Sequence, residues 1–126
     1  SVSSHIQITP EDPTIRQTYH NRSFIIQIKG TSTLWLFHPK QASLLSIHGK
    51  NNGHMISTID INDSQVNQKY PLFKHSTYIE IKIVEGMLLS IPTNWSYCHV
   101  GTPDESSKQL LATSNTIGSI VNYFLR

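Results

Sequence analysis

The 126-residue sequence has a single cysteine, few charged residues and no long apolar run, and each scarcity excludes a class of protein. Cys98 alone cannot form an internal disulfide or a thiolate-based zinc cluster. The 10 basic residues are scattered among 8 acidic ones, so no basic run follows a phosphate backbone and nucleic-acid binding is not predicted. The apolar runs stay far below the roughly 20 residues that span a bilayer. Residues 1–13 lack the basic and apolar parts of a signal peptide, so we expect no membrane contact and an intracellular or virion location.

Alternation of apolar and polar residues is the main pattern that is present, and it predicts β-strands. In the stretch 23–29 every second residue after Ser23 is apolar, and in the stretch 78–83 isoleucines alternate with Glu80 and Lys82. No long stretch keeps the 3.6-residue period of a helix. Further strands are predicted at 5–8, at 34–38 and, as the closing strand, at 119–124.

The segments between these strands are rich in turn-forming residues. Residues 48–70 are polar and are predicted to form a long connection, and residues 105–111 to form a helical turn or a loop. One hydrophobic core suits a chain of this length. We therefore expect a single domain over residues 1–126, folded as an all-β barrel or sandwich with short helical turns.

Four sequence motifs, in the same order along the chain, resemble those of the JmjC-type 2-oxoglutarate oxygenases of the cupin superfamily. They are SFIIQIKG at 23–30 followed by LWLFHP at 34–39, YPLF at 70–73, GMLLSIPTNW at 86–95 and SIVNYF at 119–124. The resemblance implies a double-stranded β-helix, a barrel of the cupin or jelly-roll type. It also implies that active relatives hold Fe(II) with two histidines and one carboxylate and use 2-oxoglutarate and O₂.

The residues at the chemical positions of this family pattern differ from those that the chemistry needs. In the family register, Gln17 and Tyr19 fall on the first histidine and the carboxylate, and Tyr97 or Cys98 falls on the second histidine. Ser32 falls on the lysine that pairs with the co-substrate carboxylate. Glutamine and tyrosine bring neither the negative charge nor the imidazole of the iron site, and serine brings no counter-charge. We therefore predict a degenerate member without the metal triad, without a cofactor and without oxygenase activity.

If the family cavity persists, the resemblance predicts a neutral lining of hydrogen-bonding side chains. That pocket would comprise Gln17, Tyr19, Ser32, Tyr97, Cys98 and Asn122. Two alternatives stay open: an Fe(II) and 2-oxoglutarate-dependent hydroxylase with displaced ligands, and a cupin that binds a small molecule without metal. Displaced ligands would be His20 and His99, with Glu11 or Asp12 supplying a carboxylate. A buried thiol that packs as a small apolar group is the alternative for Cys98.

The preferred functional expectation is a pseudoenzyme that works as a structural or protein-interaction module. The frequent Ile, Asn and Lys residues are typical of an AT-rich genome, which favours a viral protein or another component of a larger assembly. The resemblance implies additional N-terminal residues that buttress the barrel, and without them we expect either a minimal barrel or an exposed sheet edge. A protein partner or a second copy would then cover an exposed sheet edge, so self-association or docking is predicted.

Overall fold

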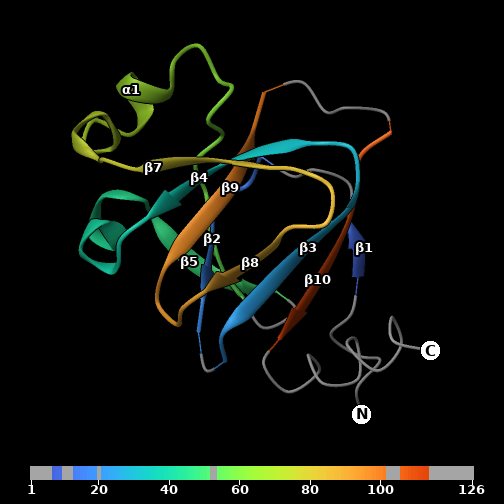
Figure 1. Ribbon diagram of the computed structural model, residues 1–126. Helices are drawn as coiled ribbons and strands as arrows, with labels where there is room; N and C mark the ends of the chain where they lie inside the picture. The colour runs from blue at the N-terminus through green and yellow to red at the C-terminus, as the bar shows by residue number, and fades with distance from the viewer. Residues whose placement is uncertain (1–6, 10–12, 20, 52–53, 102–105, 114–126) are drawn as a thin grey trace.

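Two antiparallel β-sheets form the protein in the computed structural model, which describes residues 7–9, 13–19, 21–51, 54–101 and 106–113 (Figure 1). The smaller sheet has the strand order β1-β10-β3-β8 and the larger sheet has the order β5-β6-β2-β9-β4-β7. The strands are β1 (Gln7–Thr9), β2 (Arg16–Thr18), β3 (Ser23–Lys29), β4 (Ser32–Phe37), β5 (Ile47–Asn51), β6 (His54–Ser57), β7 (Ile79–Ile83), β8 (Leu88–Ile91), β9 (Ser96–Val100) and β10 (Lys108–Thr113). The short helices are η2 (Pro39–Leu44), α1 (Val66–Lys69) and η3 (Phe73–His75).

The chain passes from one sheet to the other at each connection from β1 to β4 and again from β7 to β10, which is the strand order of a double-stranded β-helix. β1 and β3 lie in the smaller sheet and β2 and β4 in the larger one, and β7 to β10 alternate in the same way. The hairpin β5–β6 is an addition to this order, and it extends the larger sheet beyond β2. The all-β jelly-roll architecture expected from the sequence is therefore confirmed.

The main core lies between the two sheets. The inward positions of β3, β4 and β10 place Ile25, Leu34 and Leu111 in one cluster, where each is at most 8% exposed. Ile83 of β7 and Ile91 of β8 complete the cluster from the two strands at the open side of the sandwich. Because side chains alternate along each strand, the same strands leave their other residues for the outer faces.

A second apolar cluster covers the outer face of the larger sheet. Phe37 and Cys98 project from β4 and β9, and Ile15, Leu45 and Ile59 pack against them. The segment that contains η2, α1 and η3 supplies most of the half-buried residues around this cluster, and Trp35 and Val100 come from β4 and β9. No helix in the described ranges is long and apolar enough to cross a membrane.

The strands predicted at 23–29, 34–38 and 78–83 correspond to β3, β4 and β7. The helical turn or loop predicted at 105–111 is wrong from Lys108 onward, because this stretch belongs to strand β10 between β1 and β3. Its inward position is occupied by the polar Gln109, which is 1% exposed and hides the alternation that would indicate a strand.

The predicted long connection at 48–70 is wrong in part. It contains most of β5, all of β6 and the single turn α1, and polar residues at β-strand positions obscured them in the sequence. The closing strand predicted at 119–124 lies outside the described residues, and so do residues 5 and 6 of the strand predicted at 5–8, whose other two residues lie in β1.

Candidate functional site

Strand β3 carries polar residues into the barrel on both sides of an apolar one. Ser23, Ile25 and Gln27 follow each other at every second position, and all three are at most 2% exposed. Each of the two polar residues belongs to a separate hydrogen-bonded group. We call these groups the tyrosine–histidine cluster (Ser23, His54, Tyr97) and the glutamine cluster (Gln27, Ser32, His99, Gln109).

The glutamine cluster is closed by hydrogen bonds between four strands. Oε1 of Gln27 accepts from the hydroxyl of Ser32 at 3.0 Å and from the amide of Gln109 at 2.7 Å. The amide of Gln109 also donates to Oγ of Ser32. Oε1 of Gln109 lies 2.7 Å from Nε2 of His99, and because an amide oxygen only accepts, that nitrogen carries the hydrogen.

The remaining hydrogens of Gln27 are also used. Its Nε2 donates to the carbonyl oxygen of Lys29 and to the hydroxyl of Ser107, both at 2.8 Å. The side chain of Gln27 therefore uses both of its donor hydrogens and both acceptor positions inside the protein. A buried amide that is satisfied in this way is rigidly held, because losing any partner exposes a desolvated polar atom.

The tyrosine–histidine cluster is looser. The hydroxyls of Ser23 and Tyr97 each lie 3.3 Å from the same atom, Nε2 of His54. A ring nitrogen offers one hydrogen-bonding position, so the two hydroxyls share it. The rings of His54 and Tyr97 meet edge to face with centroids 5.9 Å apart. His54 is 4% exposed and comes from the additional hairpin β5–β6.

The register of β2 brings a positive charge to the same face. Arg16 pairs directly with Tyr97 of β9 and Ile56 of β6, and Thr18 pairs with His54. Cross-strand partners project to the same side of a sheet, so Arg16 lies on the inner face, where it is half-buried. The hydroxyl of Thr18 donates to the carbonyl oxygen of Pro92 at 2.7 Å and so ties this strand to the loop before β9.

The structure brings some of the predicted pocket residues together and separates others. Ser32 and Tyr97 are buried on the inner side, one in each cluster. Gln17 pairs with Ser96, on the opposite face of the sheet from Tyr97, and its amide donates to the carbonyl oxygen of Asn94. Cys98 belongs to the outer apolar cluster.

The other predicted pocket residues lie at the periphery of the barrel or outside the described residues. Tyr19 is half-buried just after β2, with the ammonium group of Lys50 5.4 Å from its ring centroid. Asn122 and His20 lie outside the described residues, as do Glu11 and Asp12. His99, which with His20 was predicted as a possible displaced iron ligand, donates a hydrogen bond to Oε1 of Gln109.

Sequence reasoning did not nominate Gln27, His54 or Gln109. Gln27 is the glutamine of the motif SFIIQIKG, so its recurrence in the family pattern was an available signal. His54 and Gln109 had no local signal. Their hydrogen-bond partners are distant in the sequence: His54 and Ser23 are 31 residues apart, and Gln109 and Gln27 are 82 residues apart.

Among the described residues, the side chains inside the barrel do not form the donor set of an octahedral iron site. Within the described ranges, no three His, Cys, Asp or Glu side chains converge so that they could hold a metal ion. The two inner histidines, His54 and His99, belong to different clusters and are engaged by hydroxyls and by an amide oxygen. The side chains at the inner positions of β2 are a cation and a hydroxyl, Arg16 and Thr18, and neither brings the imidazole or the negative charge of an iron site.

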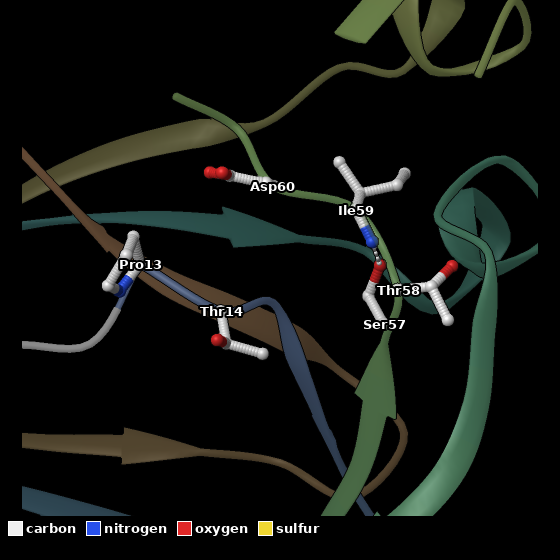
Figure 2. A pocket seen from close by; sticks show the side chains of 6 residues that line it. All are labelled: Pro13, Thr14, Ser57, Thr58, Ile59 and Asp60. Atoms are coloured by element: carbon white, nitrogen blue, oxygen red, sulfur yellow. Dashed lines mark hydrogen bonds between the residues drawn. The ribbon is translucent and has the colours of Figure 1, made fainter. Parts of the chain in front are cut away.

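Two shallow cavities lie outside the barrel. Figure 2 shows the first, of about 340 Å³, between the residues before β2 and the residues after β6: Pro13, Thr14, Ser57, Thr58, Ile59 and Asp60. The hydroxyl of Ser57 accepts from the backbone nitrogen of Ile59, drawn as a dashed line in Figure 2, and donates to Leu45. The second cavity, of about 300 Å³, lies beside η3 and includes His48, Tyr70 and Phe73.

Comparison with solved structures gives low identities. The crystal structure of hydroquinone 1,2-dioxygenase from Sphingomonas sp. TTNP3 with 4-hydroxybenzoate bound is 9% identical, with a TM-score of 0.50. The match covers 86% of this chain and 56% of that chain, and it shows a common fold. Peruvianin-I, a cysteine peptidase from Thevetia peruviana latex, is 11% identical over 86% of this chain and 45% of that chain, with a TM-score of 0.40.

The chain thus spans about half the length of these two proteins. No curated protein matches the sequence significantly. The model of the cupin-like domain family matches residues 12–125, which is nearly the whole sequence and includes both polar clusters. The chain therefore belongs to the cupin-like domain family.

Proposed function

We propose that this chain is a non-catalytic cupin-like domain, a degenerate relative of the JmjC-type oxygenases, that acts as a structural or protein-interaction module. The glutamine cluster is the observation that carries the proposal. Ser32 stands where the resemblance expects a lysine for the co-substrate, and its hydroxyl is committed to Gln27 and Gln109.

A neutral cluster in place of the family's lysine removes the positive charge that would bind the carboxylate of the co-substrate. A dicarboxylate such as 2-oxoglutarate needs a buried cation to offset the cost of removing its charge from water. Gln27, Ser32 and Gln109 are neutral, and their polar atoms already satisfy each other. To admit the co-substrate at this place, the protein would have to break these bonds without gaining an ion pair.

The residues at the positions where the family holds iron support the same proposal. Gln17, at the position of the first histidine in the family register, lies on the outer face. Of the two residues offered for the second histidine, Tyr97 contacts His54 and Cys98 lies in the outer apolar cluster. An amide that faces away and a neutral phenol give a divalent cation little to replace its hydration shell. What persists is the pair of packed sheets, a rigid scaffold on which loops and edges can bind other proteins.

The decisive experiment combines metal analysis with a turnover assay. The purified protein is loaded anaerobically with Fe(II), desalted and analysed for iron, and 2-oxoglutarate-dependent CO₂ release is measured beside an active JmjC-type hydroxylase. We expect iron far below one equivalent and CO₂ release equal to the blank. Stoichiometric iron together with co-substrate-dependent CO₂ release would overturn the proposal and favour a hydroxylase with displaced ligands.

A thermal-shift screen tests the remaining alternative, a metal-free cupin that binds a small molecule. A ligand that binds only the folded state raises Tm, and above Kd the rise grows with the logarithm of the ligand concentration. The variant Ser32→Ala reports whether any such ligand enters at the glutamine cluster. A concentration-dependent rise in Tm that Ser32→Ala abolishes would assign ligand binding to the barrel and contradict a purely structural role.

A further inference from the structure

Strand β7 is the outermost strand of the larger sheet. It pairs with β4 on one side, and no other strand in the described part of the chain pairs with its second side. The N–H and C=O groups on that side of an edge strand are a template for another strand. The register with β4 runs without interruption from Ile79 to Ile83, so no bulge interrupts this edge.

The opposite edge of the same sheet is built differently. Strand β5 contains Gly49 and Lys50, and its register with β6 shifts between Ile47 and Gly49. A shift of this kind bends the strand and disrupts further pairing, which is a common protection of sheet edges. No shift, glycine or proline occurs within β7.

Apolar side chains surround the β7 edge. Ile79 at the start of β7 is 54% exposed, and Leu88 at the start of β8 is 52% exposed. β8 is itself the edge strand of the smaller sheet and follows β7 after a short turn, in which Val84 and Met87 are also exposed (Figure 1). A concentration of exposed large apolar residues at one edge is typical of a protein–protein contact.

The charges on β7 indicate which partner fits. Glu80 and Lys82 flank Ile81 symmetrically and are both exposed. If a second copy of β7 pairs antiparallel with the first around Ile81, Glu80 lies opposite Lys82 of the partner subunit, and the same pair recurs across the two-fold axis. Opposite charges directly across two strands are favourable and like charges are unfavourable, so the strand is complementary to itself.

We propose that this chain forms a symmetric homodimer in which β7 of each copy pairs antiparallel with β7 of the other around Ile81. The two larger sheets then form one continuous sheet, and Ile79 of each subunit packs opposite Ile83 of the partner subunit. The inference rests on the proposed function in one respect: it names a second copy of this chain as a partner of the interaction module.

Charge exchange across the two-fold axis tests the register. Sedimentation velocity over micromolar concentrations measures the dimerisation constant of the native chain, Lys82→Glu, and the double variant Glu80→Lys with Lys82→Glu. In Lys82→Glu both cross-strand pairs become like-charged, and we expect dimerisation weaker by about tenfold or more. The double variant restores opposite charges in both pairs, and we expect it to recover most of the native affinity.

The matched control is Lys74→Glu, which makes the same change of charge on η3, at an exposed residue outside the strand. It should dimerise like the native chain. Amide hydrogen exchange provides a second readout, because pairing slows exchange at the outward N–H groups of β7 as concentration rises, and leaves β5 unchanged.

Three results would overturn the homodimer: a native chain that stays monomeric, a dimer indifferent to Lys82→Glu, or a double variant no better than the single one. A protected β5 in place of β7 would assign the contact to the other edge and would equally overturn it. The turnover assay for the proposed function does not depend on these outcomes. Activity with a β7 dimer would overturn only the proposed function, and a monomer without activity only the homodimer.

Discussion

The two polar clusters inside the barrel solve the same problem, a buried polar side chain, in different ways. In the glutamine cluster Gln27 has a separate partner for each of its hydrogens and for each acceptor position. In the tyrosine–histidine cluster two hydroxyls share one nitrogen of His54, both at 3.3 Å. The first arrangement fixes every member, whereas the second tolerates the loss of one hydroxyl because the other can take its place.

The difference predicts that the glutamine cluster is the more rigid of the two. The glutamine cluster connects β3, β4, β9 and β10 from both sheets and so helps to hold the sandwich together. The tyrosine–histidine cluster depends on the added hairpin β5–β6 and lies beside the half-buried Arg16. Substitutions in the two clusters should therefore differ in their effect on the free energy of unfolding.

Gln109→Met should give the largest loss, because methionine fills a similar volume but can neither accept from His99 nor donate to Gln27 and Ser32. Buried polar atoms left without partners cost about 1–3 kcal/mol each, so we expect a loss of about 2–4 kcal/mol, measured by urea denaturation. The control Gln68→Met, on the exposed side of α1, should stay within about 0.5 kcal/mol of the native chain. A loss below about 1 kcal/mol for Gln109→Met would mean that the cluster is not rigid.

Tyr97→Phe should have an intermediate effect. The ring stays in the main core, and only the hydroxyl that lies 3.3 Å from His54 is removed, while Ser23 keeps its contact with the same nitrogen. We expect a loss of about 1 kcal/mol in the same denaturation experiment. Ser23→Ala should cost a similar amount, and the double variant should cost more than the sum, because His54 then loses both hydroxyls. Strict additivity would show that the two hydroxyls do not substitute for each other.

Lys69→Met should have the smallest effect on the free energy of unfolding, because the ion pair between Lys69 and Asp63 is exposed to water. The hydrogen bond from Lys69 lowers the pKa of Asp63 below 3.8, and the same bond raises the pKa of Lys69 above 10.5. The Asp63 contribution is present above its unfolded pKa and is lost as pH falls through the lower folded pKa. The Lys69 contribution is present below pH 10.5 and is lost as pH rises through the higher folded pKa.

The measurement for this exposed pair is an NMR titration of the Asp63 carboxyl group in both proteins. In Lys69→Met its pKa should move up toward the ordinary value, because the ammonium donor is gone, while the backbone bond from Gln65 remains. An unchanged pKa would show that the pair does not persist in solution. A loss of stability as large as that of Tyr97→Phe would contradict the contrast between buried and exposed polar contacts.

Much of the architecture could be predicted from the sequence because β3 and β7 alternate cleanly. In β3 the apolar Phe24, Ile26 and Ile28 stand at every second position, and in β7 three isoleucines do, and this period indicates strands. The core side of β3 is the opposite face, where Ile25 lies between two polar residues. β10 and the hairpin β5–β6 could not be predicted in this way, because Gln109 and His54 are polar residues at buried positions. Their burial depends on partners in distant strands, which no local pattern records.

The candidate site was predictable only in part, because the sequence does not show which face of a strand each residue occupies. Ser32 and Tyr97, taken from the family register, lie inside the barrel, whereas Gln17 and Cys98 lie on the other face of the same sheet. Adjacent residues of a strand project to opposite faces, so an uncertainty of one position between Tyr97 and Cys98 decides between the interior and the outer cluster. Sequence alone offered both residues, and only the pairing of β9 with β2 and β4 separates them.

The hairpin β5–β6 has one more consequence. It inserts between β4 and β7 along the chain, joins the sheet beside β2, and places the buried imidazole of His54 against the hydroxyls of Ser23 and Tyr97. Lengthening, shortening or exchanging this hairpin would change the side chains that it contributes and would leave the other strands of the two sheets unchanged. New recognition chemistry could thus arise here by changes in a single peripheral segment, in the way that antibodies vary loops on a constant framework.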